Sequence, residues 1–366
     1  LEPSGSAYEG LSSGRMSAYD FMINAITEKT ITPAQLALEP CSGSAVVADP
    51  DTGELLALVS YPGYDNNRLS GTVDKDYYEQ LRNDKAKPLI NKATSLRTAP
   101  GSIFKPCSAI TGLEQGVIST GESIVCTGQY TAVTPSPKCW IYPRSHGAEN
   151  VSTAIRDSCN VFFYTVGHRL GMESGGTYNS TKGTDLLKNY AEQLGLATKS
   201  GVEIYEMDPH PSDRDAVASA IGQGTHAYSA INLCRYVSTL ATSGVCHDFT
   251  LVSKITDYNG NVIRDNEPVV SNTMNVSSST WNAVHQGMRL VIENTASFKG
   301  LPYQAAGKSG TAQENTNKAD HITFISYAPY DNPEVAVSVL IPNGYASSNA
   351  AKLTSDIYKI YWGLDK

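Results

Sequence analysis

The fold is decided by the stretch Ala99-Pro-Gly-Ser-Ile-Phe-Lys-Pro-Cys-Ser-Ala-Ile-Thr-Gly-Leu-Glu-Gln-Gly116. It predicts a helix that begins just after Pro100 and Gly101, with Ser102 and Lys105 one turn apart and therefore on one face. Unpaired backbone N–H groups and the macrodipole at a helix start favour a developing oxyanion. A lysine whose pKa is lowered by burial can activate a serine hydroxyl. We therefore expect Ser102 to be a nucleophile and Lys105 its base.

Two further triplets support a chemical role for this stretch. Ser158-Cys-Asn160 falls between two predicted helices, 152–157 and 161–170, and Lys308-Ser-Gly-Thr311 precedes a predicted strand at 322–327. Each motif taken singly has a purely structural explanation. Ser158 could be a helix cap, and Lys308 could lie at an exposed strand end. The S-x-x-K motif alone also fits a capped helix with a solvated lysine. In this order, however, S-x-x-K, S-x-N and K-[ST]-G are the signature of active-site serine acyltransferases that recognise penicillin.

Length and charge restrict the possible functions. A chain of 366 residues can bury one large core and a smaller appendage. The 28 basic and 36 acidic side chains give a net charge of -8 without a basic cluster, so nucleic acid is not an expected partner. No run of 18 apolar residues and no signal-peptide pattern occurs, so the sequence predicts either a cytosolic protein or a chain without its membrane anchor.

The chain is predicted to have three parts. Residues 1–14 are rich in Gly and Ser without periodicity and indicate a linker or an artificial junction. Residues 15–40 form a short helical remnant, with one helix at 17–29 and a second that begins at Thr32-Pro33 and ends near Pro40. Residues 41–366 form the main domain.

The pattern of apolar residues in the main domain predicts both strands and helices. Turn signals at Asp49-Pro-Asp-Thr-Gly53 and Asn259-Gly260 indicate hairpins. The segment 117–149 has little regular pattern. Strands are predicted at 45–48, 55–60, 250–263, 321–327 and 334–341, and helices at 74–83, 185–194, 229–243, 277–293 and 349–362.

Segments beyond the three motifs carry a resemblance to a known family. They look like the transpeptidase domain of class B penicillin-binding proteins, specifically its elongation-type branch, over roughly residues 41–364. The resemblance implies an α/β (α+β) fold with a five-stranded antiparallel sheet, a helical subdomain, and the active site between them. The segments are Val46–Pro62, Ala99–Pro106, Ser158–Tyr164, Ile221–Gly224 and Ala306–Ala312.

The resemblance also implies a role for each motif residue. Ser102 would attack the penultimate D-Ala carbonyl of a peptidoglycan stem peptide, and Lys105 would accept its proton. Ser158 would relay protons, Asn160 would orient the substrate amide, and Lys308 would hold the electrostatic network. The oxyanion hole would consist of the backbone N–H groups of Ser102 and Thr311. The substrate's terminal carboxylate would bind at Ser309, Gly310 and Thr311.

Location and partners follow from the same resemblance. The family is bacterial, membrane-anchored and active outside the cytoplasmic membrane, and it usually has an N-terminal pedestal domain. The first 40 residues here are too few for a pedestal, so we expect anchor and pedestal to be absent from this chain. The implied partners are peptidoglycan stem peptides, β-lactam antibiotics and, for the full-length protein, a membrane glycosyltransferase.

Two other functions use the same acylation residues. A serine β-lactamase must also activate water for deacylation, and no Glu motif can be assigned to that task. Class D lactamases, moreover, commonly have an apolar residue where Asn160 stands. A β-lactam-sensing domain would acylate stably without cross-linking peptides.

The chain has an odd number of cysteines, seven, and three of them fall in one segment with a histidine. Cys126, Cys139, His146 and Cys159 follow a C-x12-C-x6-H-x12-C pattern, which suits a closed tetrahedral zinc site near the active site. Some elongation-type relatives are similar, although carboxylates can occupy the first two positions there. The alternative is a disulfide between Cys126 and Cys139. The remaining cysteines are expected to be structural: Cys41, Cys107, Cys234 and Cys246.

Overall fold

The computed structural model describes residues 6–28, 30–31, 42–313 and 317–364. Its contacts divide the chain into two compact units, one of 1–42 with 62–89 and one of 43–61 with 90–366. The boundary predicted at residue 41 instead assigns 62–89 to the main domain. Among the described residues, no helix combines the length and the apolar character needed to cross a membrane.

The smaller unit is helical. Helix α2 confirms the helix predicted at 17–29, and the Ser17 side chain caps it by accepting a hydrogen bond from the Asp20 N–H at 3.0 Å. Helix α1 lies within 1–14, where no regular structure was predicted because so short a helix shows no apolar periodicity. The helix predicted after Thr32 lies outside the described residues. The elements are α1 (Ser6–Ser12), α2 (Ala18–Thr27), the 3-10 turn η2 (Asn66–Leu69) and α3 (Lys75–Asn83).

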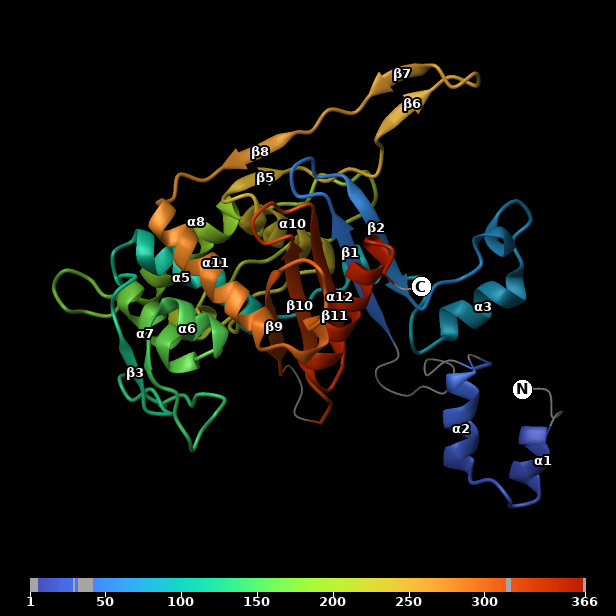
Figure 1. Cartoon of the computed structure of the whole chain (residues 1–366), viewed down its shortest axis with the longest axis horizontal. Coiled ribbons are helices and arrows are strands. Elements are labelled where there is room, and N and C mark those ends of the chain that lie inside the picture. The colour runs from blue at the N-terminus through green and yellow to red at the C-terminus, as the bar shows by residue number, and fades with distance from the viewer. Residues whose placement is uncertain (1–5, 29, 32–41, 314–316, 365–366) are drawn as a thin grey trace. The chain divides into compact units, whose positions relative to one another are not determined.

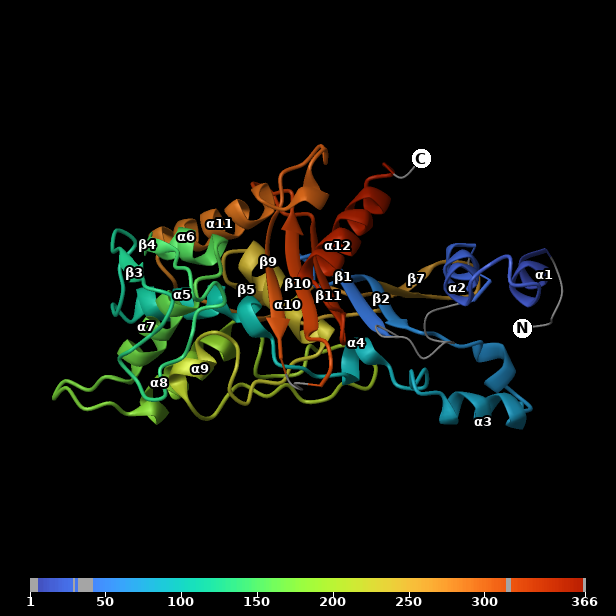
Figure 2. The same ribbon diagram turned by 90° about the horizontal axis from the view of Figure 1, so that it is seen from below.

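The larger unit is built on a five-stranded antiparallel sheet in the order β2-β1-β11-β10-β9, which confirms the expected fold class. Figure 2 shows the strands in this order, with β9 at one edge. The two hairpin strands at the N-terminal end and the two at the C-terminal end were predicted from their apolar runs. The strands are β1 (Gly43–Ala48), β2 (Leu55–Tyr61), β9 (Ala306–Ala312), β10 (His321–Ala328) and β11 (Val335–Ile341).

Helices and 3-10 turns surround this sheet. Those predicted from periodicity are present with end points shifted by a few residues, as is usual for helix ends. They are α4 (Lys92–Ser95), η3 (Gly101–Phe104), α5 (Lys105–Glu114), α6 (Val151–Arg156), α7 (Asn160–Gly171), α8 (Ser180–Gln193), α9 (Ala216–Ser219), α10 (Ala230–Ala241), α11 (Ser278–Glu293), η4 (Ala296–Phe298) and α12 (Ser347–Tyr361).

Both faces of the sheet are covered at β10 and β11, and this explains why these two strands are buried along nearly their whole length. Alternate residues of β11 belong to two different clusters of buried hydrophobic side chains. Ala336 and Leu340 pack with residues of α10, whereas Val337 and Val339 pack with residues of α12. The larger unit is thus a sheet between helical layers, and Figure 1 shows α12 running along one face of the sheet.

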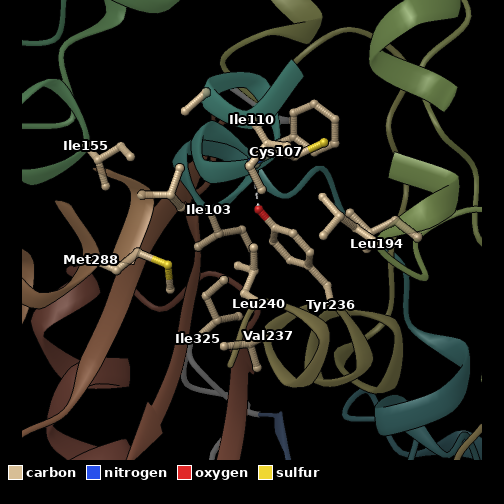
Figure 3. Packing of buried hydrophobic residues seen from close by; sticks show 14 of the residues in the cluster. Ile103, Cys107, Ile110, Ile155, Leu194, Tyr236, Val237, Leu240, Met288 and Ile325 are labelled. Carbon is tan, nitrogen blue, oxygen red and sulfur yellow. Dashed lines mark hydrogen bonds between the residues drawn. The ribbon is translucent and has the colours of Figure 1, made fainter. Parts of the chain in front are cut away.

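Helix α5 lies within the larger of the two hydrophobic clusters, the one that also contains residues of α10. Figure 3 shows the Tyr236 hydroxyl, from α10, directed at the turn of α5 that carries Cys107, with Ile103 of the preceding turn nearby. The Cys107 N–H lies in the first turn of the helix, and the Tyr236 hydroxyl accepts its hydrogen bond at 3.0 Å. This buried contact fixes α5, and with it the start of the predicted motif, against the sheet layer.

Three two-stranded ribbons complete the larger unit. The ribbon of β6 and β7 confirms the hairpin predicted at Asn259-Gly260, and Figure 1 shows it extending away from the central sheet. The other two pairs, β3 with β4 and β5 with β8, were not predicted because strands of three or four residues carry too little pattern. The ribbon strands are β3 (Ile124–Cys126), β4 (Gly147–Glu149), β5 (Val245–His247), β6 (Lys254–Thr256), β7 (Val262–Asp265) and β8 (Val270–Thr273).

Candidate active site

Ser102 lies in the 3-10 turn η3, and Lys105 is the first residue of α5. Residues three apart eclipse one another in a 3-10 helix, so the two side chains share a face as predicted. Lys105 is fully buried, whereas Ser102 is half-buried and lines an open cleft. In the part of the chain that the structure describes, no hydrogen bond joins Lys105 to the Ser102 hydroxyl. Such contacts commonly tighten only when substrate binds.

Glycines allow three backbone segments to meet beside Ser102. The Gly101 N–H donates to the Gly222 carbonyl at 3.0 Å, and both glycines have positive φ, 57° and 78°. A Cβ at Gly222 would collide with the Gly101 carbonyl, and one at Gly101 with the Thr311 carbonyl. The backbone at Ser102 is therefore held next to the backbone of Thr311. These two residues carry the N–H groups that the resemblance assigns to an oxyanion hole.

Ser158 joins α6 to α7 in a left-handed backbone conformation, with φ of 53°. A residue with a side chain rarely adopts this conformation, and such strain is concentrated at functional sites. The Lys105 Nζ donates to the Ser158 carbonyl at 2.7 Å, to the Ser158 Oγ at 3.0 Å and to the Asn160 Oδ1 at 2.7 Å. Cys159 occupies the N-cap of α7, so Ser158 is not the helix cap that the alternative interpretation required.

Lys308, on strand β9, also donates to the Ser158 hydroxyl. Its Nζ donates to the Ser158 Oγ at 3.2 Å and to the Ser309 carbonyl at 3.0 Å. The side chain is buried, with 1% of its surface exposed, so it is not an exposed strand end. Burial lowers the pKa of Lys308 well below its ordinary value, and the charge of Lys105 lowers it further.

Burial also acts on Lys105. It lowers the pKa of Lys105 from 10.5 to about 7, although charge at Cys159 and at Cys139 opposes the shift. A lysine with such a pKa is partly neutral near neutral pH. It can therefore accept a proton, which an ordinary solvated lysine cannot do at that pH.

The edge strand β9 supplies one wall of the cleft. Ser309 and Thr311 are two residues apart, so they share a face, and both line the cleft. Gly310 between them is buried, and a Cβ there would collide with the Thr323 Oγ1 and crowd the Pro100 carbonyl. The strand therefore packs directly against the segment that precedes Ser102.

The cleft has a volume of about 730 Å³ and brings together Ser102, Ser158, Asn160, Ser309 and Thr311. It also contains residues that sequence reasoning did not find. Arg156 and Asp157 directly precede Ser158, so their position in the chain could have indicated them. No motif in the neighbouring sequence indicates Trp140 or Asp320. These additional residues include Trp140, Arg156, Asp157 and Asp320. Gln223 was expected here, because the Gly222-Gln-Gly224 turn resembles a site-lining turn rather than a plain helix connection, and it does line the cleft.

The segment 117–149, which has little regular structure, is held against α7 by side chains. Arg169 donates to the Val117 carbonyl at 2.9 Å and to Glu122 at 2.7 Å. The Trp140 Nε1 donates to the Asp157 carbonyl at 3.0 Å. Antiparallel pairing of β3 with β4 places Cys126 opposite Gly147. The segment therefore reaches the residues that flank Ser158.

The four residues predicted as metal ligands come together in space. One ligand atom from each of Cys126, Cys139, His146 and Cys159 lies within 4.8 Å of the others. The Cys139 Sγ lies 3.6 Å from the His146 Nδ1, and it accepts a hydrogen bond from the Asn160 N–H at 3.3 Å. Hydrogen bonds from the Cys159 thiol and from the backbone lower the pKa of Cys139.

Two observations bear on the character of this cluster. The His146 Nε2 is buried and has no hydrogen-bond partner among the described residues. The six cysteines within the described ranges are free thiols, so the Cys126 to Cys139 disulfide of the alternative interpretation is not present there. Cys107, Cys234 and Cys246 are buried as expected for structural residues, and Cys41 lies outside the described residues.

Comparison with known proteins gives a consistent result. Residues 43–359 match the family model described as the penicillin binding protein transpeptidase domain. The chain is 29% identical over 362 residues to the peptidoglycan D,D-transpeptidase MrdA of Haemophilus influenzae, covering 88% of this chain and 53% of the relative. It is 28% identical over 351 residues to MrdA of Escherichia coli K12, covering 86% and 53%. The chain thus spans about half the length of the curated relatives it matches.

Comparison with solved structures points to the same family. A crystal structure of Pseudomonas aeruginosa PBP2 in complex with WCK 5153 superposes with a TM-score of 0.76 at 26% identity, covering 87% of this chain and 73% of that one.

Proposed function

Since the matching family model spans most of its length, this chain belongs to the penicillin-binding protein transpeptidase family, and we propose that it is a serine-type peptidoglycan D,D-transpeptidase. The expected resemblance to the elongation-type branch of class B is confirmed by relatives named MrdA and PBP2. The proposed substrates are stem peptides that end in D-Ala-D-Ala, and the proposed inhibitors are β-lactams.

In the first step the neutral Lys105 takes the proton of the Ser102 hydroxyl. The Ser102 oxygen forms a bond to the carbonyl carbon of the penultimate D-Ala, and the bond from that carbon to the terminal D-Ala nitrogen breaks. The departing nitrogen receives a proton through Ser158, so the terminal D-Ala leaves as a free amino acid. The expected oxyanion donors are the N–H groups of Ser102 and Thr311.

The other residues position the substrate. Asn160 orients the substrate amide while also accepting from Lys105. Lys308 keeps the Ser158 hydroxyl in place. The hydroxyls of Ser309 and Thr311, with Gly310 between them, bind the terminal carboxylate from the cleft-facing side of β9.

In the second step an acceptor amine attacks the ester carbonyl. A carbon–nitrogen bond forms, the carbon–oxygen bond to Ser102 breaks, and the proton lost by the amine returns to the Ser102 oxygen. A β-lactam enters the same path, but its amide bond lies in a ring, so the leaving nitrogen stays attached to the acyl group. This would explain a long-lived adduct on Ser102.

The observation that carries the proposal is the Ser158 hydroxyl, which lies between the amines of two buried lysines. Burying two lysine amines at one hydroxyl costs folding free energy that packing does not explain, and ionisable groups perturbed in this way mark catalytic sites. No local sequence motif identifies a carboxylate that could activate water, which favours a transpeptidase over a β-lactamase.

A fluorescent penicillin tests the proposal. We expect one stable label per chain, located on Ser102 by peptide mapping, that persists over hours. Rapid turnover of the drug would contradict the transpeptidase and support a β-lactamase. Stable labelling without any transfer or hydrolysis of a D-Ala-D-Ala peptide would support a sensing domain.

We also propose that the cluster of Cys126, Cys139, His146 and Cys159 holds a structural zinc ion. Three thiol sulfurs and one imidazole form a donor set that suits tetrahedral zinc. The His146 Nε2 is buried and has no hydrogen-bond partner among the described residues, as expected for a histidine that coordinates a metal ion. The ion would tie the segment 117–149 to the Ser158 turn. Elemental analysis tests this: we expect about one zinc per chain, and its absence from protein purified without chelator would contradict the proposal.

For location and organisation, we propose that residues 41–366 act as a transpeptidase domain at the extracytoplasmic face of a bacterial membrane. The named activity of the MrdA relatives supports this proposal. A membrane glycosyltransferase is the proposed partner. One solved structure that superposes with a TM-score of 0.78 at 26% identity, covering 89% of this chain and 56% of that one, is of a peptidoglycan synthase complex that coordinates polymerization and crosslinking.

A further inference from the structure

A second groove opens beside the catalytic cleft. It has a volume of about 590 Å³, and its walls come from the segment 133–137, from α7 and from the region around α9. Ile221 and Gln223 line both hollows, so the groove continues the cleft past the Gly222-Gln223-Gly224 turn. None of the three sequence motifs contributes to it.

The two hollows differ in charge. The cleft contains Arg156, Asp157 and Asp320, and the buried Lys308 lies behind its wall. In the groove, Asp215 is the one charged residue among the lining residues that the structure describes. The rest of its wall is apolar or uncharged, with Tyr164 and Tyr178 providing the largest side chains.

The reacting ends of the two substrates of cross-linking differ in the same way. The donor peptide ends in a carboxylate, which suits the polar cleft and the hydroxyls of Ser309 and Thr311. The acceptor peptide brings an amine, which is an ammonium ion in solution until it loses a proton. A carboxylate in a groove whose other lining residues are uncharged attracts such a cation.

Resting on the proposed transpeptidase function, we propose that this groove binds the acceptor stem peptide and that Asp215 attracts the ammonium group of that peptide as it approaches the acyl-enzyme. The acceptor loses one proton to solvent before it attacks, and the second proton passes to the Ser102 oxygen in the transfer step. Asp215 is therefore a binding residue for the acceptor and takes no part in acylation.

The backbone at Asp215 supports a specific role. Its φ of 56° and ψ of 80° are unusual for a residue other than glycine, and its Oδ1 accepts a hydrogen bond from the Ala218 N–H at 3.0 Å. The side chain is exposed and lines the groove. The strained position thus presents a carboxylate to the groove while one oxygen caps α9.

Asp215→Asn tests the proposal with little structural cost, because asparagine also caps helices and tolerates the left-handed conformation. The assay uses an acyl-D-alanyl thioester as donor, with either a peptide that carries a free side-chain amine or methanol as acceptor. For an exposed charge we expect the KM for the peptide amine to rise about two- to fivefold with kcat little changed. The rate with methanol, which is small and neutral, should stay the same.

Salt and a neighbouring carboxylate provide the controls. In the wild-type chain the KM for the amine should rise with ionic strength, and in Asp215→Asn this dependence should weaken. Asp213→Asn removes an exposed charge that accepts from Thr225 and does not line the groove, and it should change neither value. An unchanged KM and salt dependence in Asp215→Asn would overturn the inference alone. A wild-type chain that acylates but transfers to no acceptor would overturn the proposed function as well.

Discussion

The two walls that meet at Ser158 are built by different means. One consists of η3, α5 and β9, whose regular backbones pack in the main core and are brought together by glycine contacts. The other is the segment 117–149, which has two three-residue strands and is attached by individual side chains and by the Cys and His cluster. The first wall carries Ser102, the proposed nucleophile, and the second contacts the turn that holds Ser158 and Asn160.

This difference predicts how the stability and activity of each wall respond to substitution. Backbone packing is spread over many atoms, so a change that leaves the backbone alone should affect chemistry without stability. A segment held by a few side chains should lose shape and activity together when one of them is removed. The following predictions test this contrast, from the largest expected effect to the smallest.

Ser102→Ala should abolish acylation and leave the fold intact. We expect labelling by a fluorescent penicillin to fall by about 10⁴-fold or more, as for other nucleophile deletions. The free energy of unfolding should change by no more than about 0.5 kcal/mol, because a half-buried hydroxyl that lines a cleft contributes little packing. Mass spectrometry and denaturant unfolding measure the two effects, and labelling that survives in the variant would refute the nucleophile.

Gly222→Ala should break the first wall through its backbone. The new Cβ would collide with the Gly101 carbonyl, and φ is 78°, so we expect a loss of about 2–4 kcal/mol in the free energy of unfolding and slower acylation. Gly121→Ala is the control, since nothing lies within 4 Å of its Cβ position. Equal stability of the two variants would show that the close approach does not matter.

The rate of acylation should depend on pH through Lys105. The base must be neutral, and its pKa is lowered to about 7, so the rate should rise as pH rises and level off above that value. At pH 5 we expect a rate about a hundredfold below the plateau, since the neutral fraction falls tenfold per pH unit. Stopped-flow acylation by a chromogenic cephalosporin measures the profile, and a flat profile between pH 5 and 8 would contradict the assignment.

The same shift affects stability. Because the pKa is lowered in the folded state, the unfolded chain binds more protons between pH 7 and 10.5. The contribution of Lys105 to stability should therefore rise with pH across that window.

Cys159→Ser should damage the second wall. If the cluster holds a metal, we expect the variant to lose about 1–3 kcal/mol in stability, and to acylate a few-fold more slowly because Cys159 is next to Ser158 and Asn160 in the chain. Cys246→Ser removes a buried thiol outside the cluster and serves as the control. A chelator should lower the melting temperature of the wild type and of Cys246→Ser but not that of Cys159→Ser. Identical responses of all three proteins would contradict the metal proposal.

Much of the fold could be predicted because its strongest signals are local. Apolar runs gave the four strands other than β9, and periodicity gave the long helices. Strand β9 was implied only by the family resemblance, because its sequence, Ala306-Gly-Lys-Ser-Gly-Thr-Ala312, is small and polar and contains a single strand former, Thr311. It is a strand because it pairs with β10, where Lys308 is opposite Ile325.

The cleft was less predictable than the motifs that define it. Arg156 lies close to Ser158 in the chain, whereas Trp140 and Asp320 reach the cleft from segments with no motif of their own. Asp215 could not be found from the sequence, because a single exposed aspartate before a four-residue helix resembles any surface residue.

The sequence by itself determined the relation of Ser102 to Lys105, because residues three apart share a face in any tight helix. It also specified which side chains could form the Ser158 network and the Cys and His cluster. Only the tertiary structure decided that Lys308 reaches Ser158 from 150 residues away and that a second groove adjoins the cleft. Such contacts depend on strand pairing and on glycines where two backbone segments touch. Neither can be predicted from the spacing of residues along the sequence.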